Sequence, residues 1–224
     1  LDQLTDLVGN SGLPDLLFEA LQNRVTRARR GTVQTDPELA QVASILGVHG
    51  RPSRESIIDP CAGIGNLLAA AYHSRNSVLT HSENIQSLIA IEIEPIQCSL
   101  AALQLIMQAP SVASKIDKPK VICDSITNAF LHIKEAGVVL LNPPYKRYED
   151  DGDPLPDGYR KHLEVAIHRV KGEPAVAIKG QPDLYNYYVE LVIASMKHGA
   201  RGVFILNNKW MNTKSTQPLR KLLI

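Results

Sequence analysis

The tetrapeptide Asn142-Pro143-Pro144-Tyr145 carries the clearest chemical signal in this chain. It follows the apolar run 137–141, which predicts a buried strand that ends at the two prolines, because proline has no N–H to donate to a sheet. An amide and an aromatic ring are therefore expected at the carboxyl end of a strand, where open α/β sheets bind their ligands. A strand-ending turn with an exposed tyrosine is the alternative.

The tetrapeptide suits an amino group that is conjugated to a planar ring. The side-chain oxygen of Asn142 and the carbonyl of Pro143 can accept both N–H bonds of such a group, which favours a nitrogen with an available lone pair. The ring of Tyr145 offers a face for stacking on a planar base. Any conjugated planar amine or amide fits these features, so the tetrapeptide alone does not identify the substrate.

A second candidate site lies at 59–66, directly after a strand predicted at 56–59. Gly63 and Gly65 allow a sharp turn before a helix. Leu68 stands where the third glycine of a dinucleotide-binding loop belongs, and no Gly-Lys-Ser/Thr phosphate loop follows. The loop therefore suits a zwitterion, with Asp59 facing an ammonium group while glycine amides and a hydroxyl face a carboxylate. A tight turn without a ligand is the alternative.

The next predicted strand, 88–92, ends in acidic residues that suit a ribose. Glu92 and Glu94 compete to accept hydrogen bonds from both ribose hydroxyls. Pro95 is well placed as the first residue of a helix, which makes Glu94 the neighbour of its cap. Glu92 is then the ribose ligand, and Ile93 is the apolar floor under a purine.

A third strand, predicted at 120–123, is followed by Asp124-Ser125. Asp124 can accept a hydrogen bond from an adenine amino group, and a simple turn residue is the alternative. Taken together, the three strand ends describe a pocket for S-adenosylmethionine. The fourth strand end places the tetrapeptide beside it.

In these motifs the chain resembles the gamma class of N6-adenine DNA methyltransferases, over roughly residues 31–224. The resemblance implies that Asn142, Pro143, Pro144 and Tyr145 are catalytic, and that the substrate is an adenine flipped out of double-stranded DNA. It implies that Thr35, in the segment Thr35-Asp36-Pro37, contacts the methionine carboxylate of the cofactor. The other implied cofactor contacts are Asp59, Pro60, Cys61, Ala62, Gly63, Gly65, Glu92, Ile93, Asp124 and Ser125.

Further segments resemble type IIG restriction-modification enzymes and their phage-defence relatives. These segments are 142–149, Asp183-Leu184-Tyr185, 202–210 and Leu219-Arg220. Lys146, Tyr185 and Trp210 are weaker candidates for substrate contact, with packing as the alternative for the two aromatic residues. Target recognition is expected from a region outside this chain, and the nuclease motif of the family has no counterpart here.

Two other functions stay open from the sequence. A methyltransferase that acts on a ribosomal RNA base or on a protein glutamine would use a similar tetrapeptide, but those relatives usually carry a different first motif. A non-catalytic cofactor-binding subunit of a defence complex is the second alternative. The intact pair of Asn142 and Tyr145 argues against it.

Strands and helices alternate from residue 56 onward, which predicts an α/β fold with a mostly parallel sheet covered by helices on both faces. The resemblance implies that this is the Rossmann-like fold of S-adenosylmethionine-dependent methyltransferases. The predicted strands are 56–59, 88–92, 120–123, 138–141 and 202–206, and the predicted helices are 37–47, 66–75, 95–108, 160–170 and 184–197. A helical segment at 1–30 is expected before a catalytic domain at 31–224. Within this domain 146–182 is expected to form a lid-like insertion, and a plain surface excursion is the alternative. The pattern stops in the apolar run 222–224, so the final strands are expected to be truncated.

Composition narrows the class of protein only modestly. The 24 Lys and Arg residues nearly balance the 23 Asp and Glu residues, so the net charge of +1 gives no whole-chain argument for a polyanion partner, although a local basic face would suffice. Cys61, Cys98 and Cys123 lie far apart, which favours a reducing cytoplasm over a disulfide framework. The seven scattered histidines form no metal motif, and no apolar run predicts a membrane span.

Overall fold

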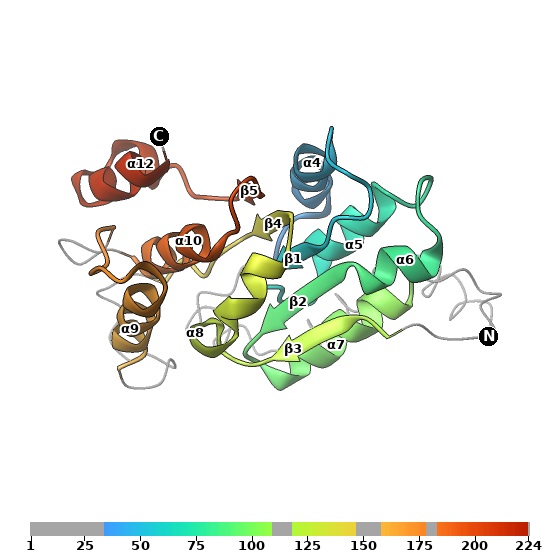
Figure 1. The fold of residues 1–224 in the computed structure, drawn as a ribbon, viewed down its shortest axis with the longest axis horizontal. Helices are drawn as coiled ribbons and strands as arrows, with labels where there is room; N and C mark the ends of the chain where they lie inside the picture. Colours follow the sequence, from blue (N-terminus) through green and yellow to red (C-terminus); the bar gives the residue numbers. More distant parts are fainter. Residues whose placement is uncertain (1–33, 109–117, 147–157, 178–182, 224) are drawn as a thin grey trace.

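The computed structural model describes residues 34–108, 118–146, 158–177 and 183–223 (Figure 1). The helical segment predicted at 1–30 lies outside the described residues, as do 147–157 and 178–182 of the predicted insertion.

A five-stranded parallel sheet forms the centre of the fold (Figure 1). Its strands are β1 (Ile57–Asp59), β2 (Leu88–Glu92), β3 (Lys120–Cys123), β4 (Val138–Leu141) and β5 (Arg201–Phe204), in the spatial order β3-β2-β1-β4-β5. All five predicted strands are confirmed: β2, β3 and β4 have the predicted bounds, and the bounds of β1 and β5 shift by one or two residues. The chain runs outward from β1 to β3, then returns to pair β4 with the other side of β1. Such a reversal opens a crevice at the carboxyl ends of the strands.

Helices cover both faces of the sheet, as the alternation predicts. On one face lie α4 (Pro37–Val48), α5 (Asn66–His73) and α7 (Pro95–Ile106); on the other lie α8 (Ile126–Ala129), η1 (Phe130–Glu135), α9 (Tyr159–Lys171) and α10 (Leu184–Ser195). The sequence did not predict the shortest elements, because one turn of helix leaves too few residues for a periodic pattern. These are α6 (His81–Gln86), α8, η1, α11 (Lys209–Asn212), η2 (Lys214–Thr216) and α12 (Gln217–Leu223).

The core is divided by the sheet, because successive strand residues point to opposite faces. Ile58, Val139 and Leu141 pack toward α8, α9 and α10. Ile57, Val138 and Leu140 pack toward α4 and α5. Burial on both sides explains why the three inner strands β1, β2 and β4 are mostly apolar, whereas the edge strands β3 and β5 are partly exposed. Among the described residues, no helix is long and apolar enough to span a membrane.

The first helix of the described chain is fixed at its start by Asp36. This residue caps α4, since its side-chain oxygen accepts hydrogen bonds from the backbone N–H groups of Glu38 (2.9 Å) and Leu39 (3.3 Å). Pro37 occupies the first turn, as predicted. The cap also fixes the chain immediately before it, where Thr35 lies.

In Figure 1 the arrowheads of β2 and β3 point toward the side on which α9, α10 and α12 gather.

Candidate active site

The sheet brings the four predicted strand ends to one edge. Asp59 ends β1 and Glu92 ends β2, while Asp124 follows β3 and Asn142 follows β4. Because β1 pairs with both β2 and β4, the acidic strand ends and the amide lie at the same carboxyl edge. This edge is the candidate active site.

Asp59 is buried at the floor of the candidate site, with 1% of its surface exposed. One carboxylate oxygen accepts a hydrogen bond from the N–H of Cys61 over 3.0 Å. Burial nevertheless raises the pKa of Asp59 from 3.8 to about 8, and the nearby Glu92 raises it further. The following loop needs its glycines, because Gly63 and Gly65 adopt positive φ angles of 54° and 92°.

Glu92 ties the ends of β1 and β2 together. Its Oε2 accepts a hydrogen bond from the N–H of Gly63 (2.9 Å), and its Oε1 accepts from the N–H groups of Ile93 (2.8 Å) and Glu94 (3.0 Å). Burial raises the pKa of Glu92 despite these donors. The amide of Gly65 donates to the carbonyl of Ala62 (2.8 Å). Both glycine amides thus have protein acceptors, which differs from the expectation that they face a ligand carboxylate.

The two buried carboxylates of Asp59 and Glu92 have no cationic partner in the described part of the chain. Buried negative charge without a counterion is costly, so this floor suits a ligand that carries positive charge. Gln97, which is buried close to Gly63, adds an Nε2 group without a hydrogen-bond acceptor. Ile93, beside Glu92, remains 39% exposed and offers the apolar surface that was predicted for a purine.

The third strand end connects the site to α9. Oδ1 of Asp124 accepts hydrogen bonds from the N–H of Ser125 (2.6 Å) and from the side chain of Asn128 (3.0 Å). The Ser125 hydroxyl caps α8 and lies 3.1 Å from the hydroxyl of Tyr159, which in turn lies 2.8 Å from that of Tyr188. No sequence pattern marks Tyr159, and only the folded structure brings this first residue of α9 to the site.

Asn142 is held in one orientation by a residue far away in the chain. Its Nδ2 donates a hydrogen bond to Thr35 Oγ1 over 2.9 Å. The Thr35 carbonyl accepts a hydrogen bond from Asn66 Nδ2 at the start of α5 (3.2 Å). The other atom of the Asn142 amide, Oδ1, is buried and has no hydrogen-bond partner. The catalytic candidate therefore presents an oriented acceptor that lacks a donor.

Tyr145 is half-buried beside this amide. Its hydroxyl donates a hydrogen bond to the carbonyl of Ile205, directly after β5. Its ring lies 6.0 Å from that of Tyr185, at an angle of 49°. Burial raises the pKa of Tyr145 to about 12. The phenol is therefore protonated at neutral pH, which excludes it as a base and leaves its ring as the useful group.

The weaker substrate candidates are largely packed. Lys146 and Tyr185 are only 3% and 1% exposed, and the Lys146 carbonyl accepts a hydrogen bond from the N–H of Leu184 (2.8 Å). Trp210, in α11, packs against the same core cluster as Tyr145. Contact of these three side chains with a substrate stays a prediction.

Within the described ranges, no group of three His, Cys, Asp or Glu side chains is arranged to hold a metal ion.

The fold and the edge site define the class of protein. A structure described as a class I S-adenosylmethionine-dependent methyltransferase from Listeria monocytogenes aligns with a TM-score of 0.59 at 16% identity, over 86% of this chain and 53% of that one. This similarity shows that the fold is that of the class I methyltransferases.

The family follows from the sequence. Residues 86–224 match the model of the Eco57I restriction-modification methylase, and the chain belongs to this family of restriction-modification DNA methyltransferases. A search of curated proteins finds no match.

Two solved structures illustrate the relationship. The type IIG restriction endonuclease BpuSI aligns with a TM-score of 0.73 and 25% identity, over 89% of this chain. The DrdV–DNA complex aligns with a TM-score of 0.67 and 12% identity, over 94% of this chain. The present chain spans 23% of the BpuSI chain and 24% of the DrdV chain.

Proposed function

We propose that residues 31–224 are the catalytic domain of a DNA methyltransferase that transfers a methyl group from S-adenosylmethionine to N6 of adenine. The observation that carries this proposal is the buried, unpartnered Oδ1 of Asn142, oriented by Thr35 at the end of β4. A buried acceptor without a donor costs about 1–3 kcal/mol. An amino N–H of a base that enters the site would satisfy it.

The residues at the ends of β1, β2 and β3 fit the proposed cofactor. When bound, S-adenosylmethionine supplies a methyl group that is activated by its positively charged sulfur. Asp59 would hold the ammonium group of its methionine part, which accounts for a buried carboxylate without a counterion. Oε2 of Glu92 carries one hydrogen bond and retains acceptor capacity for a ribose hydroxyl.

The remaining cofactor contacts extend the same edge. Ile93 would lie under the purine, and Asp124, which is exposed, would accept a hydrogen bond from its amino group. Thr35 is proposed to contact the methionine carboxylate. Pro60, Cys61, Ala62, Gly63, Gly65 and Ser125 would shape the wall of the pocket.

The substrate amino group would be activated by two acceptors. Asn142 Oδ1 and the Pro143 carbonyl would accept its two N–H bonds, which localises the nitrogen lone pair in the transition state. Tyr145 would stack on the base, with its hydroxyl anchored on Ile205. Because the nitrogen loses its proton only after methyl transfer, the site needs no strong base. The protonated state of Tyr145 agrees with this mechanism.

The partner is proposed to be double-stranded DNA from which the target adenine is flipped. DrdV, a structural relative, was solved in complex with DNA. Target recognition is proposed to come from a region outside this chain, in a cytoplasmic restriction-modification or phage-defence protein. The described cysteines, all unpaired, fit a reducing compartment.

Transfer of labelled methyl from S-adenosylmethionine tests the proposal. The full-length protein that contains this chain is incubated separately with duplex DNA, RNA and protein, and the labelled DNA is digested to nucleosides. We expect label in N6-methyladenine. Label in cytosine, or only in RNA or protein, would overturn the proposal.

An Asn142→Ala variant separates chemistry from binding. Loss of one positioned hydrogen-bonding group in an active site typically lowers the rate about 100- to 1,000-fold. We expect a loss of this size in methyl transfer, with cofactor affinity retained in a calorimetric titration. An equal loss of both would contradict the assigned role.

A further inference from the structure

The end of the chain has an unusual charge distribution. Residues 191–224 contain no aspartate or glutamate, whereas the whole chain has a net charge of only +1. The cations in this stretch are Lys197, Arg201, Lys209, Lys214, Arg220 and Lys221. Like charges that gather in one region repel one another, and a polyanionic partner would relieve this repulsion.

Three lysines of this region have no carboxylate partner among the described residues, as is also true of Lys118 and Lys134 elsewhere on the chain. On other surfaces, Arg54 pairs with Glu83 (2.7 Å) and Lys120 pairs with Glu135 (2.7 Å). Lys209, Lys214 and Lys221 are exposed, and none of them forms an ion pair within the part of the chain that the structure describes. Their positive charges are therefore available to an external anion.

Lys209 and Lys214 are presented by a firmly bonded turn, residues 209–216, which we call the basic turn. The hydroxyl of the buried Thr216 lies within hydrogen-bond distance of the carbonyl oxygens of Trp210 (2.8 Å) and Thr213 (2.9 Å), to either of which it can donate. The two N–H groups of Arg220 Nη1 lie within hydrogen-bond distance of the same two carbonyl oxygens (2.7 and 3.0 Å) and of Thr216 Oγ1 (2.9 Å). The Arg220 guanidinium therefore stabilises the backbone of the basic turn, whereas Lys209 and Lys214 are exposed to solvent.

The basic turn lies beside the catalytic strand end. β5 pairs with β4, and the N–H of Ile205 donates to the carbonyl of Leu141 (2.8 Å). The Ile205 carbonyl accepts the Tyr145 hydroxyl. Lys209 follows Ile205 by only four residues, so its Cα lies within about 14 Å of that anchor even if the chain is fully extended. Lys214 lies close to Lys209, because the N–H and the hydroxyl of the preceding Thr213 donate to the Lys209 carbonyl (3.0 and 2.8 Å). Both lysines therefore lie near the strand end that is proposed to receive the target base.

We propose that Lys209 and Lys214 form a contact surface for DNA backbone phosphates next to the target nucleotide. This inference rests on the proposed function, since it assigns the partner of the same site. The lysines hold the duplex against the β4–β5 side of the edge while the base is flipped. Such contacts are independent of sequence and depend on salt, because each neutralised phosphate releases bound cations.

A salt titration tests this surface in the full-length protein. The affinity for fluorescein-labelled duplex DNA is measured over KCl concentrations from about 50 to 200 mM, for the wild type and for Lys209→Gln/Lys214→Gln. The slope of log affinity against log salt should become shallower by about 0.9 for each lost phosphate contact. We expect a change of about 1.8 for the double variant, equal for two duplexes of unrelated sequence.

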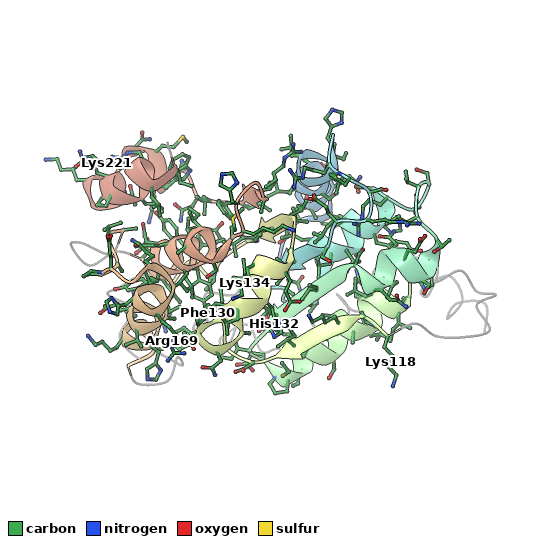
Figure 2. The ribbon with its side chains drawn as sticks, in the orientation of Figure 1. Lys118, Phe130, His132, Lys134, Arg169 and Lys221 are labelled. Carbon is green, nitrogen blue, oxygen red and sulfur yellow. The ribbon has the colours of Figure 1, made fainter. Side chains whose placement is uncertain are left out.

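Lys118 and Lys134 provide a matched control with the same loss of charge. Both are exposed, and they precede β3 and β4, at the amino ends of the strands. Figure 2 labels them apart from Lys221 on α12. Lys118→Gln/Lys134→Gln should leave the slope unchanged, and Lys209→Arg/Lys214→Arg should retain the wild-type slope. Equal melting temperatures will show that all variants fold.

The outcomes distinguish this surface from the proposed reaction. A salt dependence of DNA affinity that becomes shallower in Lys209→Gln/Lys214→Gln supports the phosphate contact surface. If the same protein transfers no methyl group to DNA, only the proposed function fails. An unchanged slope in Lys209→Gln/Lys214→Gln, or an equal change in the control pair, overturns the surface, even where adenine is methylated. A change seen with RNA but not with duplex DNA also overturns it.

Discussion

The side chains of Thr35 and Asn142 are joined by a hydrogen bond of 2.9 Å, although the two residues lie 107 positions apart. The bond fixes which end of the Asn142 amide points away from α4, and it leaves Oδ1 as the buried acceptor. The segment before the first described helix therefore contributes directly to the geometry at the end of β4. Thr35 positions the amide, in addition to the cofactor contact proposed for it.

The Thr35→Val variant keeps the shape of the side chain and removes its hydrogen-bonding oxygen. The amide of Asn142 then loses its orienting partner, which we expect to lower kcat about 5- to 10-fold, the equivalent of one ordinary hydrogen bond. Thr35→Ser retains the hydroxyl and should stay close to the wild type. Single-turnover kinetics and a separate cofactor titration distinguish the two roles: a change in cofactor affinity with an unchanged kcat contradicts positioning.

Glu92→Ala should weaken cofactor binding and destabilise the fold together. The substitution leaves the N–H groups of Gly63, Ile93 and Glu94 without their acceptor. Each of these hydrogen bonds contributes about 0.5–1.5 kcal/mol, so their joint loss should lower the melting temperature by about 5 °C or more. Glu94→Ala is the control and should change neither quantity appreciably. Unchanged cofactor affinity in Glu92→Ala would transfer the ribose role to Glu94.

The raised pKa of Asp59 predicts a pH-dependent stability in the absence of ligand. Its pKa is about 8 in the folded protein, against 3.8 as the unperturbed value. The folded state therefore holds a proton that the unfolded state releases, and this contribution to stability is complete below pH 3.8 and is lost as the pH rises to about 8. The Asp59→Asn variant has no carboxyl proton at this position, so its stability lacks this dependence on pH.

Thermal unfolding across this pH range checks the assignment. The melting temperature of Asp59→Asn, relative to that of the wild type, should rise with pH up to about 8 and then level off. A ligand with an ammonium group binds the deprotonated form, so cofactor affinity should increase with pH over the same interval. A difference between the two proteins that does not vary with pH would contradict a buried, protonated Asp59.

The three cysteines should differ in their reaction with a thiol-alkylating reagent. Cys123 is exposed, whereas Cys98 is buried. Burial also raises the pKa of Cys98 and of Cys61, so that little thiolate is present at either position. We expect iodoacetamide to label Cys123 first and Cys98 last, as measured by mass spectrometry of peptides. Early labelling of Cys98 would show that the buried face of α7, on which Cys98 lies, is not packed against the rest of the protein.

The sequence predicted the parts of the site that depend on local pattern. Apolar runs that end in Asp59, Glu92 and Asn142 locate the carboxyl ends of strands, and parallel pairing then brings these ends to one edge. Hydrogen bonds across long loops have no such signature. The link from Thr35 to Asn142 and the chain of hydroxyl groups through Tyr159 depend on how helices pack on the sheet.

The glycine loop shows a different limit of sequence reasoning. Gly63 and Gly65 were expected to turn the chain, and their positive φ angles agree. The Gly63 N–H donates to Glu92 at the end of the neighbouring strand, and the Gly65 N–H donates to the Ala62 carbonyl within the loop. Residue type therefore predicted where the backbone bends, whereas the acceptors of the two N–H groups follow from the folded loop and from the position of Glu92.

The strand order has a consequence for how such a domain can diversify. Because β1 lies between β2 and β4, the proposed methyl-donor residues occupy one half of the sheet, and the groups proposed to act on the acceptor occupy the other. The halves meet along the short pairing of β1 with β4 and through Thr35. Substitutions on the β4–β5 side would change the groups proposed to contact the acceptor without disturbing the backbone contacts of Glu92. A change of substrate would then leave the proposed donor pocket intact.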